Sequence, residues 1–285
     1  MALPQRDDPW HGLSAETLRF LEIHQARAVA IPGRSWRDLG DAVMLYSAIE
    51  RDPFFNRLVA VRWPEVSAEF DVRLRETNEL FTSLGRWPHV WAVPGLSQPP
   101  DLVARLTAKG FVNQGGGYDM LLVRDPGEEP LPSLPPGAVV SHWNCTPPEQ
   151  VQPRAEAIAG VIEAAFSLPE ARRSNLQREI GLTLERPIFH AYVISVEDEP
   201  IATGQRYTFD GASYLSSIGT RPRWRGLGLG TYLTRLMVSE SLQAGLDLVY
   251  LGVYSDNPRV VGLYERLGFA ILGGESADLL LRPAG

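Results

Sequence analysis

Three glycines at alternating positions form the clearest chemical motif in the sequence. Residues 218–231 read IGTRPRWRGLGLGT, with Gly226, Gly228 and Gly230 at the start of a helix predicted for residues 228–244. Because glycine has no Cβ, the backbone amides of such a loop can approach an anion closely. The first amides of the helix have no intrahelical acceptor, and its N-terminus carries a partial positive charge. This combination predicts a diphosphate-binding loop.

Two common nucleotide-binding motifs do not fit these glycines. The P-loop requires a Lys directly after its last glycine, and none follows here. The dinucleotide fingerprint requires a third glycine where this sequence has Thr231 or Leu233. The strand before the loop also follows a predicted antiparallel hairpin, whereas a Rossmann unit starts from a parallel βαβ arrangement. An enzyme that uses NAD or ATP is therefore a poorly supported interpretation.

A different motif does fit. Residues 225–230 (RGLGLG) have the pattern R-x-x-G-x-G, which resembles the acyl-CoA pyrophosphate loop of the GNAT superfamily of N-acetyltransferases. Residues 257–269 resemble the second signature of that family, N-x-x-A-x-x-L-Y-x-x-x-G-F, with Val260 in place of Ala. Residues 201–204 (IATG) resemble its third strand. The resemblance covers about residues 139–285 and implies that this part of the chain binds acyl-CoA.

The resemblance also implies which residues bind the acyl donor, expected to be acetyl-CoA. The backbone around residues 218–220 would pair with the acyl carbonyl and the pantetheine arm, and the amides of the loop would hold the pyrophosphate. Asn257 would contact the pantetheine arm, although it is also a good helix N-cap. The predicted acyl-CoA-binding residues are Ile218, Gly219, Thr220, Arg225, Gly226, Leu227, Gly228, Leu229, Gly230, Thr231 and Asn257.

Direct acyl transfer needs an acid for the leaving thiolate and a route for the proton of the amine. Tyr264 is the predicted general acid. The family often places a Glu on its fourth strand, but here that strand, ASYLSSIGT, has no carboxylate. Ser216 is the predicted catalytic relay. The identity of the base stays open between Ser216, Ser217, Tyr214 or water, with Glu163 and Asp256 as further possibilities. His190 is more typical of a strand residue than of a base, and Cys145 has no partner typical of a nucleophile.

The organisation of the chain predicts two modules. A stretch with five prolines, residues 125–138, has no apolar periodicity and reads as an extended linker. Residues 102–116 and 260–274 are similar at an offset of 158 residues, so that Gly-Phe and Gly-Gly pairs coincide. Each half is therefore expected to end in a short helix, a strand, a Gly-Gly turn and a final apolar strand.

We accordingly expect a degenerate GNAT-like module at residues 1–124 and an acyl-CoA-binding GNAT N-acetyltransferase domain at residues 139–285. The first half has no R-x-x-G-x-G motif, and Leu106 stands where the second half has Tyr264. The predicted fold class is α/β, with each module a mixed, mostly antiparallel sheet flanked by helices.

Periodicity and turn signals place the individual elements. The predicted helices are residues 15–27, 72–84, 101–109, 149–166, 169–184, 228–244 and 257–267. The predicted strands are residues 57–62, 90–93, 110–117, 139–143, 188–196, 201–209, 212–220 and 247–254.

Composition narrows the function classes. The 285 residues carry 27 basic and 34 acidic side chains, and a net charge of -7 argues against a general nucleic-acid binder. No apolar run reaches the roughly 18–20 residues that cross a bilayer, and no secretory signal is evident, so a cytoplasmic location is expected. One Cys excludes a cysteine-based zinc cluster, and no metal is expected. A monomer and a homodimer are both compatible with the sequence.

The predicted function is transfer of an acyl group from acyl-CoA to an amine of a small molecule or a protein. The protein would thus be an acyltransferase that transfers groups other than aminoacyl groups. The alternative is a non-catalytic acyl-CoA-binding regulatory protein, which the missing strand carboxylate favours.

Overall fold

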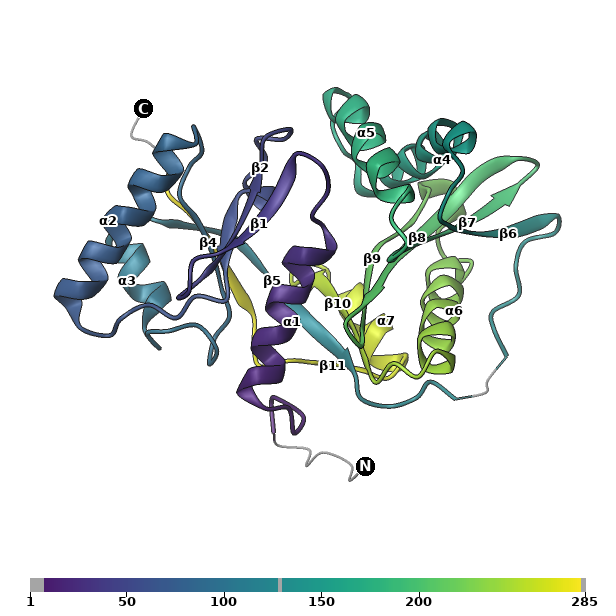
Figure 1. Ribbon diagram of the computed structural model, residues 1–285. Coiled ribbons are helices and arrows are strands. Elements are labelled where there is room, and N and C mark those ends of the chain that lie inside the picture. Colours follow the sequence, from purple (N-terminus) through teal and green to yellow (C-terminus); the bar gives the residue numbers. More distant parts are fainter. Residues whose placement is uncertain (1–7, 128–129, 283–285) are drawn as a thin grey trace. The chain divides into compact units, whose positions relative to one another are not determined.

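The computed structural model describes residues 8–127 and 130–282 (Figure 1). Residues 1–7 and 283–285 of the two predicted modules, and residues 128–129 of the predicted linker, lie outside the described ranges. The chain forms two compact units. Within the described residues, the first unit contains residues 8–119, 253–261 and 271–282, and the second contains residues 120–127, 130–252 and 262–270. Each unit is described separately below.

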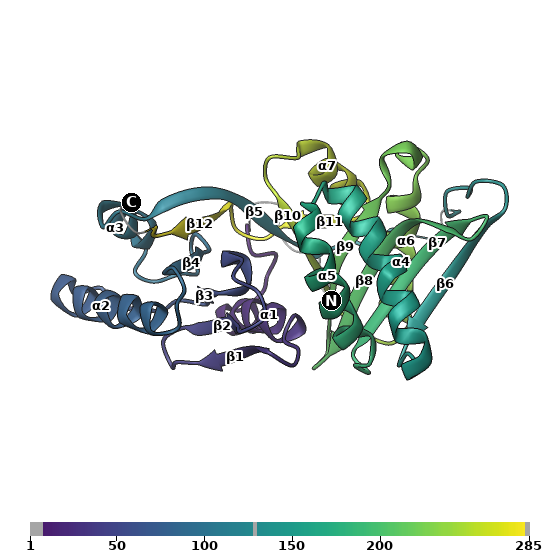
Figure 2. The same ribbon diagram turned by 90° about the horizontal axis from the view of Figure 1, so that it is seen from above.

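The first unit is built around a sheet with the strand order β1-β2-β3-β4-β12-β5. Its strands are β1 (Arg34–Asp38), β2 (Val43–Ser47), β3 (Arg57–Val59), β4 (His89–Ala92), β12 (Ser276–Leu280) and most of β5 (Val112–Leu122). Its helices are α1 (Ala15–Ala28), α2 (Ser67–Ser83) and α3 (Leu102–Ala108), with a short 3-10 turn at Pro53–Phe55. Figure 2 shows β12 between β4 and β5, as the antiparallel pairing on both sides requires.

The second unit is built around a sheet with the strand order β10-β9-β8-β7-β6. Its strands are β6 (Ala138–Asn144), β7 (Phe189–Val196), β8 (Glu199–Phe209), β9 (Ala212–Thr220) and β10 (Leu248–Tyr254). Its helices are α4 (Pro148–Phe166), α5 (Arg173–Leu184), α6 (Leu229–Gln243) and α7 (Pro258–Arg266), with 3-10 turns at Glu170–Arg172 and Pro222–Trp224. Strand β11 (Phe269–Ile271) pairs with β5. Strands β5, β10 and β11 and helix α7 each contribute residues to both units.

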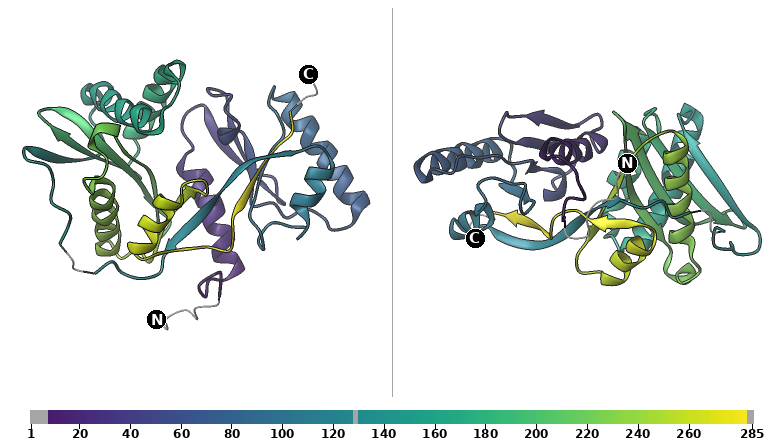
Figure 3. Two further views of the ribbon diagram at one scale, coloured as in Figure 1. Left: turned by 180° about the vertical axis from the view of Figure 1, so that it is seen from behind. Right: turned by 90° about the horizontal axis from the view of Figure 1, so that it is seen from below.

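Helices cover both faces of the second sheet. Figure 1 shows α4 and α6 on opposite sides of strands β7–β9. In the left view of Figure 3, which is seen from behind, α6 runs along these strands. Successive side chains of a strand point to opposite faces of the sheet, so each strand offers side chains to both helices. Arg206 on β8 reaches Ser241 on α6, whereas Gly219 on β9 lies against Ala165 and Phe166 of α4. The α/β fold class with a mixed sheet flanked by helices is confirmed.

The structure confirms the predicted hairpin meander of β7, β8 and β9. Asp210 and Gly211 have φ values of 47° and 79°, and Glu197 and Asp198 have values of 48° and 63°. Two consecutive residues with positive φ form the tight turn that matches the twist of antiparallel strands. The antiparallel β8–β9 pairing is therefore set by a turn signal that is visible in the sequence.

Other expectations differ from the structure. Strands β1 and β2 were not predicted, and α2 begins at Ser67, five residues earlier than expected. The predicted Gly-Gly turn is wrong in the first half, because Gly115 and Gly116 lie inside the continuous strand β5. A Cβ at Gly116 would lie 2.1 Å from the carbonyl oxygen of Ser276, so close approach of β12 requires this glycine.

The C-terminal strand β12 groups with the first unit and not with the second. The predicted boundary assigns all of residues 139–285 to one module, but the contacts group β12 with the first unit. Ala277 and Leu279 point into the apolar core that also contains Leu58, Val90 and Leu106. Since β12 has hydrogen-bonded neighbours on both sides, it is a central strand of the first unit's sheet.

Leu279→Ala tests this membership. The side chain is fully buried, so its truncation should lower the free energy of unfolding by about 2–5 kcal/mol. Chemical denaturation followed by tryptophan fluorescence measures the loss, because Trp63 belongs to the same core. Leu131→Ala, at an exposed position, is the control and should change little. A loss no larger than that of the control would contradict the assignment of β12 to this core.

Candidate functional site

Strand β9 has two partners over only part of its length. It pairs with β8 from Ala212 to Thr220, but its parallel pairing with β10 covers only Ala212–Leu215 against Leu248–Leu251. Within the described part of the chain, no ladder with β10 extends beyond Leu215. Residues 216–220 therefore present backbone amides and carbonyls along an open strand edge. An extended ligand can pair with such an edge as another strand would. The donor-binding role of Ile218, Gly219 and Thr220 stays a prediction.

A β-bulge shapes this edge. Thr203 pairs with Gly219 and Gln205 pairs with Ser216, so one more residue lies on β9 than on β8 between these pairs. Ser217 has a φ of 49°, in the left-handed region that costs a non-glycine residue energy. The extra residue re-aims the side chains on either side of it. Ser216 consequently lies on the α4 face of the sheet, while Ile218 approaches Gly204 near Met237 of α6.

The glycine loop follows directly after β9. Gly226 and Gly228 have φ values of 82° and 77°, and Gly228 is the N-cap of α6. A Cβ at Gly228 would also come within 3.1 Å of the Pro132 side chain, whereas a Cβ at Gly230 would meet nothing. The amides of Leu229, Gly230 and Thr231 form the first turn of the 15-residue helix α6. They have no intrahelical acceptor and suit an anion.

The arginines around the loop are engaged within the protein. Arg221 Nε donates to the carbonyl of Pro200 at 2.7 Å, and Arg223 contacts the carboxylate of Glu199. Arg225 Nη2 donates to the carbonyl of Ala165 at 2.7 Å, at the end of α4. These arginine side chains are thus used within the protein, whereas the first amides of α6 have no intrahelical acceptor. Binding of the acyl donor by Arg225 stays a prediction.

Tyr264 lies on α7 and is 7% exposed. Its ring packs edge-on against Phe269, with centroids 5.9 Å apart, and its hydroxyl makes no hydrogen bond to the described residues. Burial raises the pKa of Tyr264 to about 12, with a smaller contribution from the phenol of Tyr214. The hydroxyl therefore keeps its proton at neutral pH, as a general acid must.

Asn257 is confirmed as the N-cap of α7. Its Oδ1 accepts from the amide of Val260 at 3.3 Å, and its carbonyl accepts from the amides of Val260 and Val261. This use of the side chain stabilises the start of the helix that carries Tyr264. Its contact with a pantetheine arm stays a prediction.

Two of the side chains considered as bases do not suit that role. Both oxygens of Glu163 accept from Arg173, at 2.7 and 2.8 Å, and this pairing lowers the pKa of the carboxyl. His190 is a strand residue, as expected, and its Nδ1 lies 3.0 Å from Nε2 of His142.

Ser216 is half-buried, and its hydroxyl makes no hydrogen bond to the described residues. Cys145 is exposed and has a φ of 47°, directly after β6.

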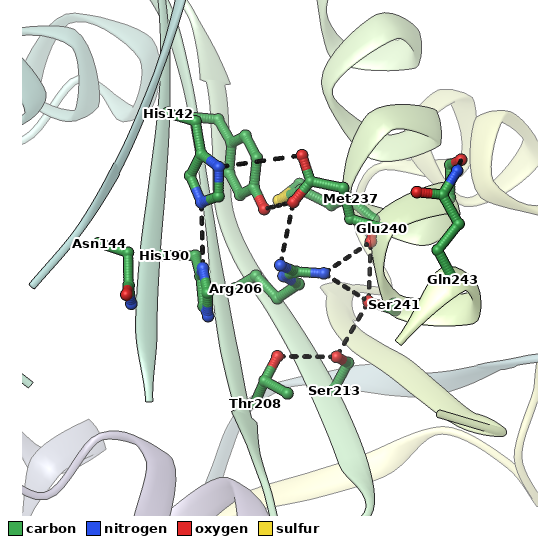
Figure 4. A network of polar contacts seen from close by, with 12 residues as sticks. His142, Asn144, His190, Arg206, Thr208, Ser213, Met237, Glu240, Ser241 and Gln243 are labelled. Carbon is green, nitrogen blue, oxygen red and sulfur yellow. Dashed lines mark hydrogen bonds and ion pairs between the residues drawn. The ribbon is translucent and has the colours of Figure 1, made fainter. Parts of the chain in front are cut away.

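The sequence did not reveal a polar network that joins α6 to the sheet (Figure 4). Arg206 Nη2 donates to Glu240 at 3.0 Å, and the Tyr192 hydroxyl donates to the same carboxylate oxygen at 2.5 Å. The ring of His142 stacks on Tyr192 at 4.4 Å. Arg206 also reaches Ser241 at 3.2 Å. One feature of the sequence could have indicated this network, because Gln205 and Arg206 are adjacent polar residues inside an apolar strand.

The histidines at the exposed end of this network resist protonation. Burial, Arg206 and His142 lower the pKa of His190 from 6.5 to about 4. Burial also lowers the pKa of His142, against the attraction of Glu240. Below pH 6.5 the imidazole of His190 is protonated in the unfolded chain, whereas in the folded protein it stays neutral until the pH approaches about 4.

This difference predicts a pH dependence of stability. The contribution of His190 is complete above pH 6.5 and is lost as the pH falls toward 4, so the free energy of unfolding rises with pH in this window. His190→Asn should flatten that slope, whereas stability at pH 7.5 should change much less. Urea denaturation of both proteins between pH 4.5 and 7.5 measures the difference. Parallel curves for wild type and variant would contradict the shift.

The loop geometry gives a second prediction. Gly228→Ala places a Cβ at positive φ and close to Pro132, and should lower the free energy of unfolding by about 1–2 kcal/mol. Gly230→Ala is the matched control, because that glycine is helical with open space around it. Its stability should stay equal or rise by up to about 1 kcal/mol. Thermal unfolding compares the two, and equal losses would contradict the conformational argument.

The described residues contain neither a membrane-spanning helix nor a metal-binding cluster. No helix in residues 8–127 and 130–282 is long and apolar enough to cross a membrane. In the same ranges, no group of three or more His, Cys, Asp or Glu side chains is arranged to hold a metal ion.

Part of the chain is similar to known acetyltransferases. Residues 156–269 match the model of the acetyltransferase (GNAT) family. The chain is also similar to a mycothiol acetyltransferase from Nocardiopsis dassonvillei, with 46% identity over 54 residues. That segment is 19% of this chain and spans only 16% of the relative.

Solved structures share the fold over nearly the whole chain. A GCN5-related N-acetyltransferase from Kribbella flavida superposes with a TM-score of 0.65 at 22% identity, over 94% of this chain and 96% of that one. A tandem GNAT protein from the clavulanic acid biosynthesis pathway gives a TM-score of 0.61 at 17% identity, over 99% of each chain. The tandem arrangement therefore fits the fold of this chain.

Proposed function

We propose that the chain transfers an acyl group from acyl-CoA to an amine, since residues 156–269 match the model of the acetyltransferase (GNAT) family. The donor we propose is acetyl-CoA, and the acceptor is an amine of a small molecule or a protein. The similarity to a mycothiol acetyltransferase supports acetyl as the transferred group. The glycine loop and the β9 edge of the second unit would bind the diphosphate and the acyl end of the donor, because the first half has no R-x-x-G-x-G motif.

The observation that carries this proposal is the open edge of β9 followed by the glycine loop. The edge begins where the β10 ladder ends at Leu215, and the loop begins directly after Thr220. An extended pantetheine arm can pair with backbone groups of residues 216–220, and the diphosphate can then reach the amides at the start of α6. A backbone N–H on the same edge can stabilise the oxyanion that forms on the acyl carbonyl.

The chemistry follows from these positions. The neutral amine attacks the thioester carbonyl, and a tetrahedral intermediate forms with its negative charge on oxygen. When the intermediate collapses, the C–S bond breaks and the electron pair leaves on sulfur. Tyr264 gives its proton to that thiolate, and the amine loses a proton to water or through Ser216. Burial raises the pKa of Tyr264, so the phenol carries its proton before each turnover, and the proposed acid role rests on that proton and on the position of Tyr264 on α7.

A regulatory protein that binds acyl-CoA without turnover is the second candidate. The observation that favours it is the missing carboxylate on β9, together with the ion pair that occupies Glu163. Release of free thiol from acetyl-CoA across a panel of amines separates the two candidates. Binding of acetyl-CoA without amine-dependent thiol release would favour the regulator.

Tyr264→Phe tests the acid role. The variant removes only the hydroxyl, so kcat should fall by roughly 100-fold or more, the scale of general acid catalysis, while KM for acetyl-CoA changes little. Tyr46→Phe, on β2, is the control for loss of a phenol elsewhere and should keep its activity. Thiol release and thermal unfolding are measured for both. An unchanged kcat in Tyr264→Phe would remove this residue as the acid.

A further inference from the structure

The proline-rich segment before β6 is fastened to the second unit, to which its described residues belong. Just before this segment, the amides of Val123 and Arg124 donate to the carbonyl of Gly268 at 3.0 and 3.2 Å. Gly268 directly follows the last turn of α7, and a Cβ there would lie 2.1 Å from the carbonyl oxygen of Arg124. Only glycine allows two backbones to approach so closely. The path of the segment is therefore fixed where it begins.

Arg235 on α6 holds the segment at its next described point. The residue is 8% exposed, and its Nη1 donates to the carbonyl of Pro130 at 3.0 Å. Its Nη2 donates to the carbonyl of Gly127 at 3.3 Å. A guanidinium is always charged and offers several donors in a fixed geometry, so one side chain can bind two carbonyls of another segment. Arg235 therefore ties the segment to the side of α6.

Pro132 brings the segment to the glycine loop. A Cβ at Gly228 would come within 3.1 Å of Cβ and 3.5 Å of Cγ of Pro132, so the proline ring lies directly against this glycine. Gly228 is the N-cap of α6, and Arg235 follows it by about two helical turns. Positions two turns apart share one face of a helix. Residues 130–132 thus run along that face toward the N-terminus of α6.

The glycine loop needs such a support for a physical reason. Gly226 and Gly228 adopt positive φ, which only glycine does at little cost, yet glycine also loses the most conformational freedom when it is fixed. A ligand that must order the loop pays for that order in affinity. Proline has a nearly fixed φ, so Pro130 and Pro132 stiffen the segment that packs on the loop. A stiff neighbour at Gly228 favours the left-handed N-cap before any anion arrives.

We propose that residues 130–132, held by Arg235, are a positioning element of the acyl-donor site, and that they fix the loop amides for the diphosphate of acyl-CoA. This inference rests on the proposed function, because it concerns the donor of the same reaction. Pro132 and Arg235 act through Gly228 and the first turn of α6, and they touch no reacting atom.

The test compares two prolines of the same segment. Pro132→Ala removes the ring beside Gly228, whereas Pro136→Ala, at an exposed position, frees a proline φ without that contact and is the matched control. Arg235→Met removes both hydrogen bonds to the segment and keeps a long side chain. Calorimetry gives the Kd for acetyl-CoA. Steady-state kinetics gives kcat and KM with acetyl-CoA and with S-acetylpantetheine, which has neither the diphosphate nor the nucleotide.

The Kd for acetyl-CoA should rise about threefold in Pro132→Ala and about tenfold in Arg235→Met, and should not change in Pro136→Ala. The kcat at saturating acetyl-CoA and the kcat/KM for S-acetylpantetheine should stay at the wild-type values. A variant that lost the same factor with both donors would indicate a general structural defect and overturn the inference. An unchanged Kd in Pro132→Ala would also overturn it, even where Arg235→Met fails to fold.

Hydrogen–deuterium exchange without any ligand separates the two proposals. The amides of residues 226–231 should exchange faster in Pro132→Ala than in Pro136→Ala or wild type. Faster exchange together with weaker acetyl-CoA binding, in a protein that acetylates no amine, would support the inference and count against the proposed function. Amine acetylation by the wild type, with equal exchange and equal Kd in Pro132→Ala, would overturn the inference and leave the proposed function standing.

Discussion

Strand β9 loses its β10 partner after Leu215, and its backbone groups from Ser216 to Thr220 then need other hydrogen-bonding partners. A strand edge inside a sheet is costly to leave unpaired, because each buried amide or carbonyl loses its contact with water. The bulge at Ser217 lies within this stretch, and the glycine loop follows directly after Thr220. The proposed acyl-CoA site follows from this constraint, since the ligand supplies what the missing strand would have supplied.

The contacts of the loop arginines within the protein also support the proposed acyl-CoA site. Arg221, Arg223 and Arg225 bind carbonyls and a carboxylate of neighbouring segments, and so they hold the loop between β8, β9 and α4. The loop is therefore preorganised, and an anion bound there meets amides that are already in place. The Arg206–Glu240 pair contributes in the same way, because it fixes α6 on the sheet through a partner that is largely buried.

Much of the second unit could be predicted because its signals are local. The Asp210–Gly211 turn, the largely apolar run of β7 and the glycines before α6 each appear within a short window of sequence. The strands of the first unit were harder to predict, because β1 is mostly exposed and β2 lacks alternation. Pairing of β12 with β4 joins segments almost 190 residues apart, and no local pattern specifies such a contact.

The site also combines features that a local motif predicts with features that depend on the pairing of distant segments. The positions of the glycine loop and Tyr264 were predictable from motif spacing, whereas the bulge at Ser217 required the register of β8 against β9. No local pattern of residues shows where strand pairing stops, and only the cross-strand pairing shows that Ser216 stands where the β10 ladder has ended.

Hydrogen–deuterium exchange with and without acetyl-CoA tests the central claim most directly. If the donor pairs with the open edge and the loop, the amides of residues 216–231 should exchange more slowly when acetyl-CoA is present. The outer strand β6, residues 138–144, serves as an internal reference and should be unaffected. Binding of acetyl-CoA without protection of residues 216–231, or with protection confined to another part of the chain, would contradict this account.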